Sequence, residues 1–372
     1  MGYRLILFVL LVPLLTAGCG VKNLETTLPV TPSMTAIPAT KTSTRTPFPT
    51  ITPTQTFTPT PTFTLTASPS PTATPVPHPM DILAMRRGNY PGSEIVIEKE
   101  MESGVNYRRY YAYYLSEGLK IYGLLTIPMA QIPEGGYPAL VFLHGYIAPT
   151  QYRTTERYLA YTDWLSRNGY VVYKIDLRGH DRSEGIANGA YSTPGYTVDV
   201  LNAVSSLQQN PQVNQDKIGI WGHSMGGFLA LRAMVITKDI KAGVIWAGLV
   251  CDYPDMFYRW HPINITTTPS PAFRGWRADW IQQYGTPEEN PDVWRSVSAN
   301  SFLAELSGPL QLHHGTADTN VPVVFSEELA VDVFDAGGSA ELNIYDGDNH
   351  NLSNSFIIAM TRTVNFFDKY LK

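Results

Sequence analysis

The sequence predicts an α/β protein, with a mostly parallel central sheet covered by helices on both faces. From residue 139 onward, segments of strand character alternate with segments of helical spacing. The strand segments are short, continuous apolar runs, which is typical of strands buried on both faces. Glycine-rich and polar motifs directly follow several of these strands, at the edge of the sheet where proteins of this class bind ligands.

The individual elements are predicted in chain order from residue types and from the breakers between them. Three hairpin-like strands come first, separated by turn residues and closed by Pro128. The first helix of the alternating part ends at Asn168-Gly169, which is a helix stop signal. The predicted strands are residues 95–97, 107–115, 120–127, 139–143, 170–175, 217–221, 241–249, 310–313 and 341–345, and the predicted helices are residues 152–167, 197–209, 225–236, 323–336 and 356–371.

The N-terminus has the pattern of a secretory signal, which we predict to span residues 1–18. Arg4 precedes an apolar stretch that runs from residue 5 to residue 15, and small residues follow it. This stretch is too short to cross about 30 Å of hydrocarbon as a helix. The ending Leu-Thr-Ala-Gly-Cys resembles a bacterial lipoprotein signal, although Thr16 stands where an aliphatic residue is usual. The resemblance implies lipidation of Cys19 and an extracytoplasmic protein anchored to a membrane, with plain secretion as the alternative.

The segment that follows, residues 19–80, is predicted to be a disordered linker. Between residues 26 and 79, 36 of 54 positions are Thr, Pro or Ser. Such a composition cannot build a core, and its prolines favour an extended chain of about 3.1 Å per residue. Thr/Pro-rich stalks can also be glycosylated, which the sequence leaves open. Residues 81–372 remain as the folded, catalytic part.

The charge balance excludes a nucleic-acid binder. The chain has a net charge of −5, and beyond residue 80 it holds 23 basic and 31 acidic residues. A protein that binds nucleic acid usually shows a basic surplus or stripe, which is absent from this sequence. The sequence does not specify an oligomeric state.

Three motifs with catalytic residue types follow three predicted strands. Ser224 stands in a G-x-S-x-G motif between a strand and a helix, where the glycines allow a sharp turn that lifts the serine hydroxyl. Asp318 follows the strand at 310–313, and His350 follows the strand at 341–345. The order Ser, Asp, His along the chain is the order of the α/β-hydrolase fold.

These motifs identify a resemblance to a known family. Residues from about 105 to 372 resemble the α/β-hydrolase superfamily, and within it the catalytic module of prolyl-oligopeptidase-like (S9) peptidases and the dienelactone-hydrolase-like esterases. The resemblance implies an α/β-hydrolase fold with a small cap insertion and no cofactor. The matching motifs are His144-Gly145, Asp176-Leu177-Arg178-Gly179-His180, residues 222–227, His314-Gly315-Thr316-Ala317-Asp318 and His350.

The residue types suit a covalent mechanism on a serine. Ser224 is the predicted nucleophile, and His350 is the base that takes its proton. Asp318 is predicted to hold the imidazole in the correct tautomer. The N–H of Met225, directly after the nucleophile, is one predicted oxyanion donor. The resemblance implies the N–H of Tyr146 as the second.

Other residues in these motifs allow alternatives. Asp346 and Asp348 are closer to His350 in sequence than Asp318 is, so either could be the acid, although Asp in a turn commonly serves structure. A calcium loop starting at Asp346 is excluded, because its sixth position is Asn351 and its twelfth is Ile357. No H-E-x-x-H motif is present, and we expect no metal and no cofactor. His144, His180 and His223 are interpreted as structural hydrogen-bonding residues near the site.

The irregular segment at residues 252–300 is the predicted cap. It is rich in aromatic residues, which could line an acyl or leaving-group pocket or could simply pack the cap onto the body. Both interpretations stay open. The residues predicted for such a pocket are Tyr253, Phe257, Trp260, Trp276 and Trp280.

The sequence therefore predicts a membrane-tethered serine hydrolase. Its first predicted substrate is a small carboxylic ester and its second a short peptide, and the membrane contact is through the lipid anchor only. Residues 81–138 are too few for the β-propeller of the large oligopeptidases, so small substrates would reach the site directly. A binding protein that has lost catalysis on the same scaffold is the alternative from another class.

Overall fold

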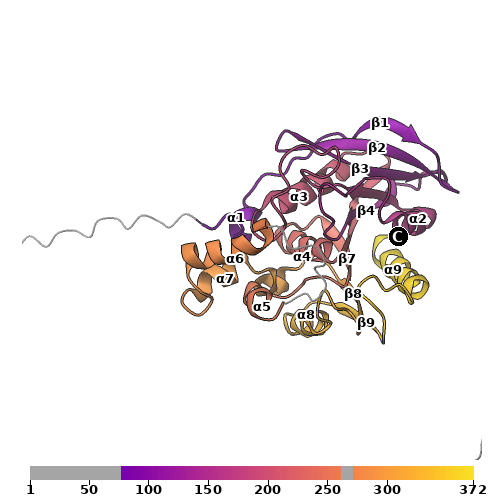
Figure 1. The fold of residues 1–372 in the computed structure, drawn as a ribbon. Coiled ribbons are helices and arrows are strands. Elements are labelled where there is room, and N and C mark those ends of the chain that lie inside the picture. Colours follow the sequence, from indigo (N-terminus) through magenta and orange to yellow (C-terminus); the bar gives the residue numbers. More distant parts are fainter. Residues whose placement is uncertain (1–76, 261–270) are drawn as a thin grey trace, which may run out of the picture. The chain divides into compact units, whose positions relative to one another are not determined.

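The computed structural model describes residues 77–260 and 271–372 (Figure 1). The predicted signal, Cys19 and the linker up to residue 76 lie outside the described residues. None of the described helices is both long enough and apolar enough to cross a membrane.

A single nine-stranded sheet forms the centre of the described part of the chain. The spatial order is β1-β2-β3-β5-β4-β6-β7-β8-β9. The first three strands pair antiparallel, β3 pairs antiparallel with β5, and the remaining neighbours are parallel. The strands are β1 Val96–Met101, β2 Tyr107–Ser116, β3 Leu119–Pro128, β4 Tyr137–Leu143, β5 Val171–Ile175, β6 Val213–His223, β7 Ile240–Trp246, β8 Leu310–Gly315 and β9 Ala340–Tyr345.

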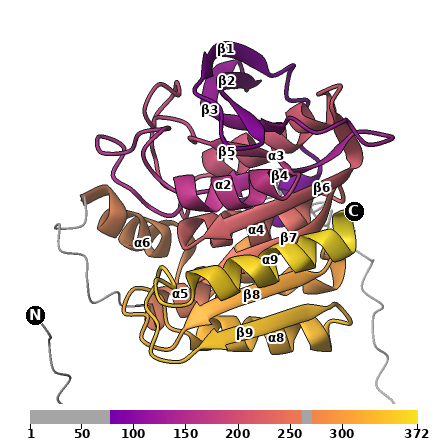
Figure 2. The same ribbon diagram turned by 90° about the vertical axis from the view of Figure 1, so that its right-hand side faces the viewer.

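Helices cover both faces of this sheet. Helices α2 and α9 contact one face, and they share an apolar cluster with one set of strand side chains (Figure 2). Helices α3, α4 and α8 contact the other face, where the larger apolar cluster lies. These helices are α2 Leu159–Arg167, α3 Gly195–Gln208, α4 Met225–Ile236, α8 Val324–Asp335 and α9 Phe356–Leu371.

The predicted fold class is confirmed. Strands β4 and β5 are buried along their whole length, as their continuous apolar sequences indicate. Helices α4 and α9 have the predicted bounds, and the predicted strands all overlap strands of the structure. The antiparallel strands β1 to β3 extend the same sheet rather than forming a domain of their own.

Helix α2 begins seven residues later than predicted, at Leu159 instead of residue 152. The cause lies in two residues of the segment before it. Tyr152 donates a hydrogen bond to Asp176 at 2.8 Å, and the Thr154 hydroxyl also bonds this carboxylate. The buried Lys174 ammonium donates to the carbonyl of Thr154 at 2.6 Å. These bonds hold the segment in a non-helical path against the end of β5.

The sequence analysis placed the start of the folded part at residue 81. In the structure, buried residues occur before that position. His78 and Met80 are buried, and helix α1 (Ile82–Arg86) follows them. Arg232 in α4 fixes this segment, because its guanidinium donates to the carbonyl of Met80 at 2.7 Å and to that of Val297 at 2.5 Å. His78 and Met80 therefore belong to the folded part of the chain, although the sequence analysis assigned them to the linker.

The predicted cap segment contains four helical elements, and those that Figure 1 labels lie together at its lower left. Its aromatic side chains are buried against one another. Tyr253 stacks on Trp280 with ring centres 5.2 Å apart, and Trp280 also contacts the His78 ring at 4.2 Å. The elements are α5 Tyr253–Tyr258, α6 Pro271–Tyr284, α7 Pro291–Val297 and the 3-10 helix η1 Ala299–Glu305.

We expect Arg232→Met to lower the free energy of unfolding by about 2–4 kcal/mol, because it leaves two buried carbonyls without their donor. Arg182→Met is the matched control, since Arg182 also makes two hydrogen bonds, to Glu98, but on the surface. Its loss is expected to stay below about 1 kcal/mol. Urea unfolding followed by circular dichroism measures the free energy of unfolding of both variants. Equal losses would contradict a stabilising role of the buried hydrogen bonds of Arg232.

Candidate active site

Ser224 occupies a sharp turn between β6 and α4. Its backbone has φ 54° and ψ −115°, a left-handed conformation that a side chain rarely adopts. The strand β7 supports the turn, because the Ser224 N–H donates to the carbonyl of Trp246 at 3.0 Å. A strained residue that is held on both sides is a frequent feature of functional sites.

Both glycines of the G-x-S-x-G motif lie so close to neighbouring backbone atoms that a side chain would not fit there. A Cβ on Gly222 would lie 2.2 Å from the carbonyl oxygen of Gly226. A Cβ on Gly226 would lie 2.3 Å from the carbonyl oxygen of Leu143, at the end of β4. The turn can therefore pack against the sheet only with glycine at both positions. The sequence prediction of a strand, a sharp turn and a helix is confirmed here.

The structure brings His350 and Asp318 into direct contact. His350 Nδ1 lies 2.7 Å from Asp318 Oδ2, and the Asp318 side chain is fully buried. Because an ionised carboxylate only accepts hydrogen bonds, this contact places a proton on Nδ1. The Nε2 atom of His350 is then the acceptor, as a general base requires.

Asp318 is held as a carboxylate by four donors. Burial raises its pKa, but the hydrogen bonds from His314 and His350 outweigh burial and hold the pKa below its usual range. His314 Nε2 lies 3.0 Å from the same oxygen that His350 contacts. The other oxygen accepts the N–H groups of Asn320 and Val321 at 2.8 and 3.0 Å. The sequence analysis did not identify this role of His314.

The two rival acids have other contacts. Asp348 accepts the N–H groups of Asn349 and Ser355, both at 2.8 Å, and so organises the loop that carries His350. Asp346 accepts a hydrogen bond from the Thr316 hydroxyl at 3.0 Å. Neither carboxylate is seen to contact the His350 ring, so the geometry favours Asp318 as its partner.

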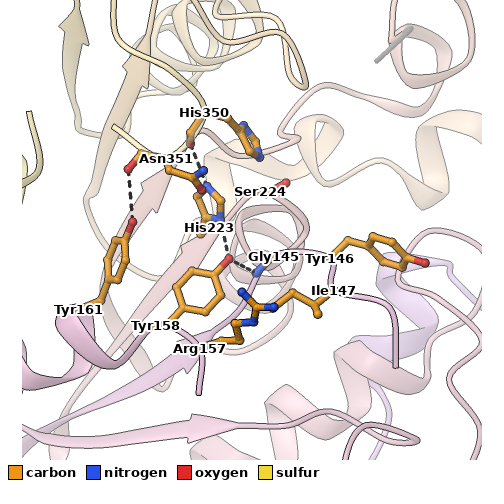
Figure 3. Close-up of a pocket in the computed structure, with 10 residues that line it drawn as sticks. All are labelled: Gly145, Tyr146, Ile147, Arg157, Tyr158, Tyr161, His223, Ser224, His350 and Asn351. Carbon is orange, nitrogen blue, oxygen red and sulfur yellow. Dashed lines mark hydrogen bonds between the residues drawn. The ribbon is translucent and has the colours of Figure 1, made fainter. Parts of the chain in front are cut away.

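Ser224 and His350 line one pocket of about 320 Å³ (Figure 3). The pocket lies at the carboxyl ends of β4 and β6, as expected for a parallel sheet. The segments that contribute its walls follow β4, β6 and β9. The lining residues are Gly145, Tyr146, Ile147, Arg157, Tyr158, Tyr161, His223, Ser224, His350 and Asn351.

A chain of hydrogen bonds joins three of these segments (Figure 3). The Gly145 N–H donates to the Tyr158 hydroxyl oxygen at 2.9 Å, and that hydroxyl lies 2.7 Å from His223 Nδ1. His223 Nε2 lies 2.9 Å from the carbonyl oxygen of His350. Because a carbonyl only accepts, Nε2 carries the proton and Nδ1 accepts from Tyr158. Burial, and then the charge of His350, lower the His223 pKa to about 3, so His223 is neutral near pH 7.

The structural interpretation of three histidines agrees with these contacts. His223 makes the hydrogen bonds just described, and His144 and His180 are buried beside Tyr152. The involvement of Tyr158 was missed by the sequence analysis, because its position inside a predicted helix gave no signal.

The five cap residues predicted for the substrate pocket do not line the pocket of Ser224. Tyr253, Phe257, Trp260, Trp276 and Trp280 are all buried in the apolar cluster under the cap. Trp276, for example, meets the edge of Phe257 with ring centres 5.2 Å apart. The structure therefore places these rings in packing, which was the other interpretation of the segment.

The predicted oxyanion donors lie beside the serine. Met225 is the first residue of α4, where the N–H groups of the first turn have no partner within the helix. Tyr146 lines the pocket, next to Gly145. Both roles stay predictions, as do the roles of the three triad residues. No group of three potential metal ligands occurs within residues 77–260 and 271–372.

Fold and site together define an α/β-hydrolase of the serine hydrolase type. The chain belongs to the prolyl oligopeptidase family, peptidase S9, whose family model matches residues 157–372. This match contains Ser224, Asp318 and His350.

Known proteins of this kind include peptidases and esterases. The uncharacterized peptidase YuxL of Bacillus subtilis is 26% identical over 247 residues, a match that covers 65% of this chain and 35% of YuxL. The chain thus spans about a third of the length of that relative.

Two solved structures show the same fold at lower identity. The acetyl xylan esterase from Paenibacillus sp. R4 has a TM-score of 0.57 and 18% identity, covering 78% of this chain and 92% of the esterase. The acylaminoacyl peptidase of Pyrococcus horikoshii has a TM-score of 0.56 and 21% identity, covering 72% of this chain and 42% of the peptidase.

We expect Asp318→Asn to lower the rate of Ser224 labelling by a fluorophosphonate by about 10³-fold or more, since an amide cannot hold the same tautomer of His350. Asp348→Asn is the control, and its loss is expected to stay within about tenfold, because the amide oxygen keeps the bond from the Asn349 N–H and only the bond from the Ser355 N–H is lost. Circular dichroism checks that both variants fold. A large loss in Asp348→Asn with little in Asp318→Asn would show that the acid is misassigned.

Proposed function

We propose that this protein hydrolyses small carboxylic esters through an acyl-enzyme on Ser224. The observation that carries the proposal is that the pocket of Ser224 has an exposed wall. Residues 96–128, which precede the matched family region, extend the central sheet as β1 to β3. No separate gating domain is found within the described residues, and Tyr146 on the pocket wall is 56% exposed. The exposed wall supports direct access of small soluble substrates to the serine.

The proposed reaction has two halves, formation of an acyl-enzyme and its hydrolysis, and the same triad acts in both. The Ser224 oxygen attacks the ester carbonyl while His350 Nε2 takes the hydroxyl proton. The oxyanion that forms accepts hydrogen bonds from the N–H groups of Met225 and Tyr146. The bond to the leaving alcohol then breaks, and His350 returns the proton to that oxygen. In the second half, His350 Nε2 takes a proton from the water that attacks the acyl carbonyl, and returns it to the Ser224 oxygen as the acyl–oxygen bond breaks and the acid leaves.

A second candidate is the hydrolysis of short peptides. Membership of a family named for an oligopeptidase favours it, as does the likeness to an acylaminoacyl peptidase. The acetyl xylan esterase, which the chain covers almost completely, supports the ester instead. Both reactions need the same triad, so only substrates can separate them.

We expect purified protein to hydrolyse p-nitrophenyl acetate or butyrate with a kcat/KM at least about tenfold above that for aminoacyl and prolyl p-nitroanilides. Ser224→Ala is expected to remove ester turnover, because no nucleophile remains. Faster cleavage of the anilides would instead assign a peptidase. A folded protein that cleaves neither class, and does not react with a fluorophosphonate, would be a binding protein.

The protein is further proposed to be extracytoplasmic and anchored by lipid on Cys19. The support is the sequence pattern of residues 1–19 and the Thr/Pro-rich segment after it, which suits a tether.

We expect the full chain, expressed in bacteria, to pellet with membranes and to dissolve only in detergent. Cys19→Ala is expected to release it, since no thiol remains for lipidation. The matched control is Cys251→Ala, whose buried thiol lies in the folded domain and should leave the membrane fraction unchanged. Membrane retention of Cys19→Ala would contradict lipidation.

A further inference from the structure

The wall of the Ser224 pocket carries one permanent charge, on Arg157. Among the ten lining residues there is no Asp, Glu or Lys, and His223 is neutral near pH 7 because burial lowers its pKa to about 3. Arg157 itself is exposed. Figure 3 shows its guanidinium on the same side of the pocket as Gly145 and Ile147. The pocket therefore carries a positive charge in a chain whose net charge is −5.

No carboxylate is seen to neutralise this charge. The ion pairs found within residues 77–260 and 271–372 engage other arginines, such as Arg178 with Asp199 and Arg259 with Glu328. The segment 261–270 contains no Asp or Glu, and residues 1–76 contain a single acid, Glu25. An arginine in a pocket that lacks an internal counter-ion is available for an anion of the substrate.

Three other polar side chains of the pocket wall are held by hydrogen bonds within the protein. The Tyr158 hydroxyl and both ring nitrogens of His223 belong to the hydrogen-bond chain described above. The Tyr161 hydroxyl donates to the carbonyl of Asn351 at 3.3 Å. These bonds fix this part of the wall, and Arg157 is the one cationic donor among the lining residues of the pocket.

The backbone that carries Arg157 is held on both sides. Before it, Thr154 bonds Asp176, and its N–H donates to Asp181 at 3.1 Å. After it, Tyr158 is fixed by Gly145 and His223. Two such anchors fix the backbone from which Arg157 projects, so little backbone entropy is lost when its side chain binds a ligand.

We propose that Arg157 forms an anion subsite beside Ser224, and that the preferred substrates carry a carboxylate close to the scissile carbonyl. A planar guanidinium binds a carboxylate through two parallel hydrogen bonds, which orient the substrate as well as hold it. This inference deepens the proposed function and rests on it. It narrows the substrate class from small esters to acidic esters.

Matched ester pairs test the subsite on both sides of the scissile bond. p-Nitrophenyl hemiglutarate is compared with p-nitrophenyl valerate for the acyl side, and 4-carboxyphenyl butyrate with 4-carbamoylphenyl butyrate for the leaving group. We expect the acidic member of one pair to have the higher kcat/KM by about tenfold or more. The pair that shows the preference identifies the side that Arg157 contacts.

Variants then assign the preference to Arg157. Arg157→Met is expected to reduce the acidic-to-neutral ratio of kcat/KM to near one, and Arg157→Glu to invert it. Arg153→Met is the matched control, because Arg153 lies in the same segment but binds the carbonyls of Thr150 and Tyr152. It is expected to keep the wild-type ratio. Raising the salt concentration should lower the ratio in the wild type, because exposed charges are screened.

The outcomes separate this inference from the proposed function. Turnover of neutral esters with a ratio near one in the wild type overturns the subsite and leaves the esterase in place. If no ester is cleaved, the esterase proposal fails, and competition against fluorophosphonate labelling decides the subsite. Protection by glutarate that exceeds protection by glutaramide, and that is lost in Arg157→Met, supports it. Equal protection by the two compounds overturns it.

Discussion

The left-handed turn at Ser224 is the constraint on which the rest of the site depends. It forces the start of α4 to pass close to the end of β4, where Gly226 lies against the carbonyl of Leu143. Because α4 and β4 are thereby fixed, the segment after β4 must leave the sheet next to the serine. Gly145 and Tyr146 then lie beside it. The pocket is in this sense a consequence of one backbone conformation that two glycines permit.

A second layer of hydrogen bonds holds the loops around this turn. His223 precedes Ser224 and binds the backbone of His350, so it links the residues that are predicted to act as nucleophile and base. Tyr158 extends the same chain to Gly145. Asp348 holds the loop of His350 from its other end. Such a network positions reacting groups before a substrate arrives, which lowers the cost of reorganisation during the reaction.

Local sequence predicted the parts that depend on local chemistry. Helix α4 and the turn before it follow from Gly222 and Gly226, and their bounds were predicted correctly. The start of α2 was wrong because Tyr152 and Thr154 are committed to Asp176, a partner that is distant in sequence. The support of Asp318 by His314 was missed for a different reason, since it depends on a loop that folds back.

The cap and the segment before α2 differ in their contacts with the pocket, and the sequence left the role of the cap open between substrate binding and packing. An aromatic-rich insertion suggests a binding surface, but rings such as Tyr253 and Trp280 bury one another and gain stability by excluding water. The segment from Tyr146 to Tyr158 has fewer apolar residues, yet it forms a wall of the pocket. Since a side chain can select a substrate only where it meets one, we expect this segment to influence selectivity in the Ser224 pocket. The cap then contributes chiefly by holding α4 and the N-terminal segment in place, through bonds such as those of Arg232.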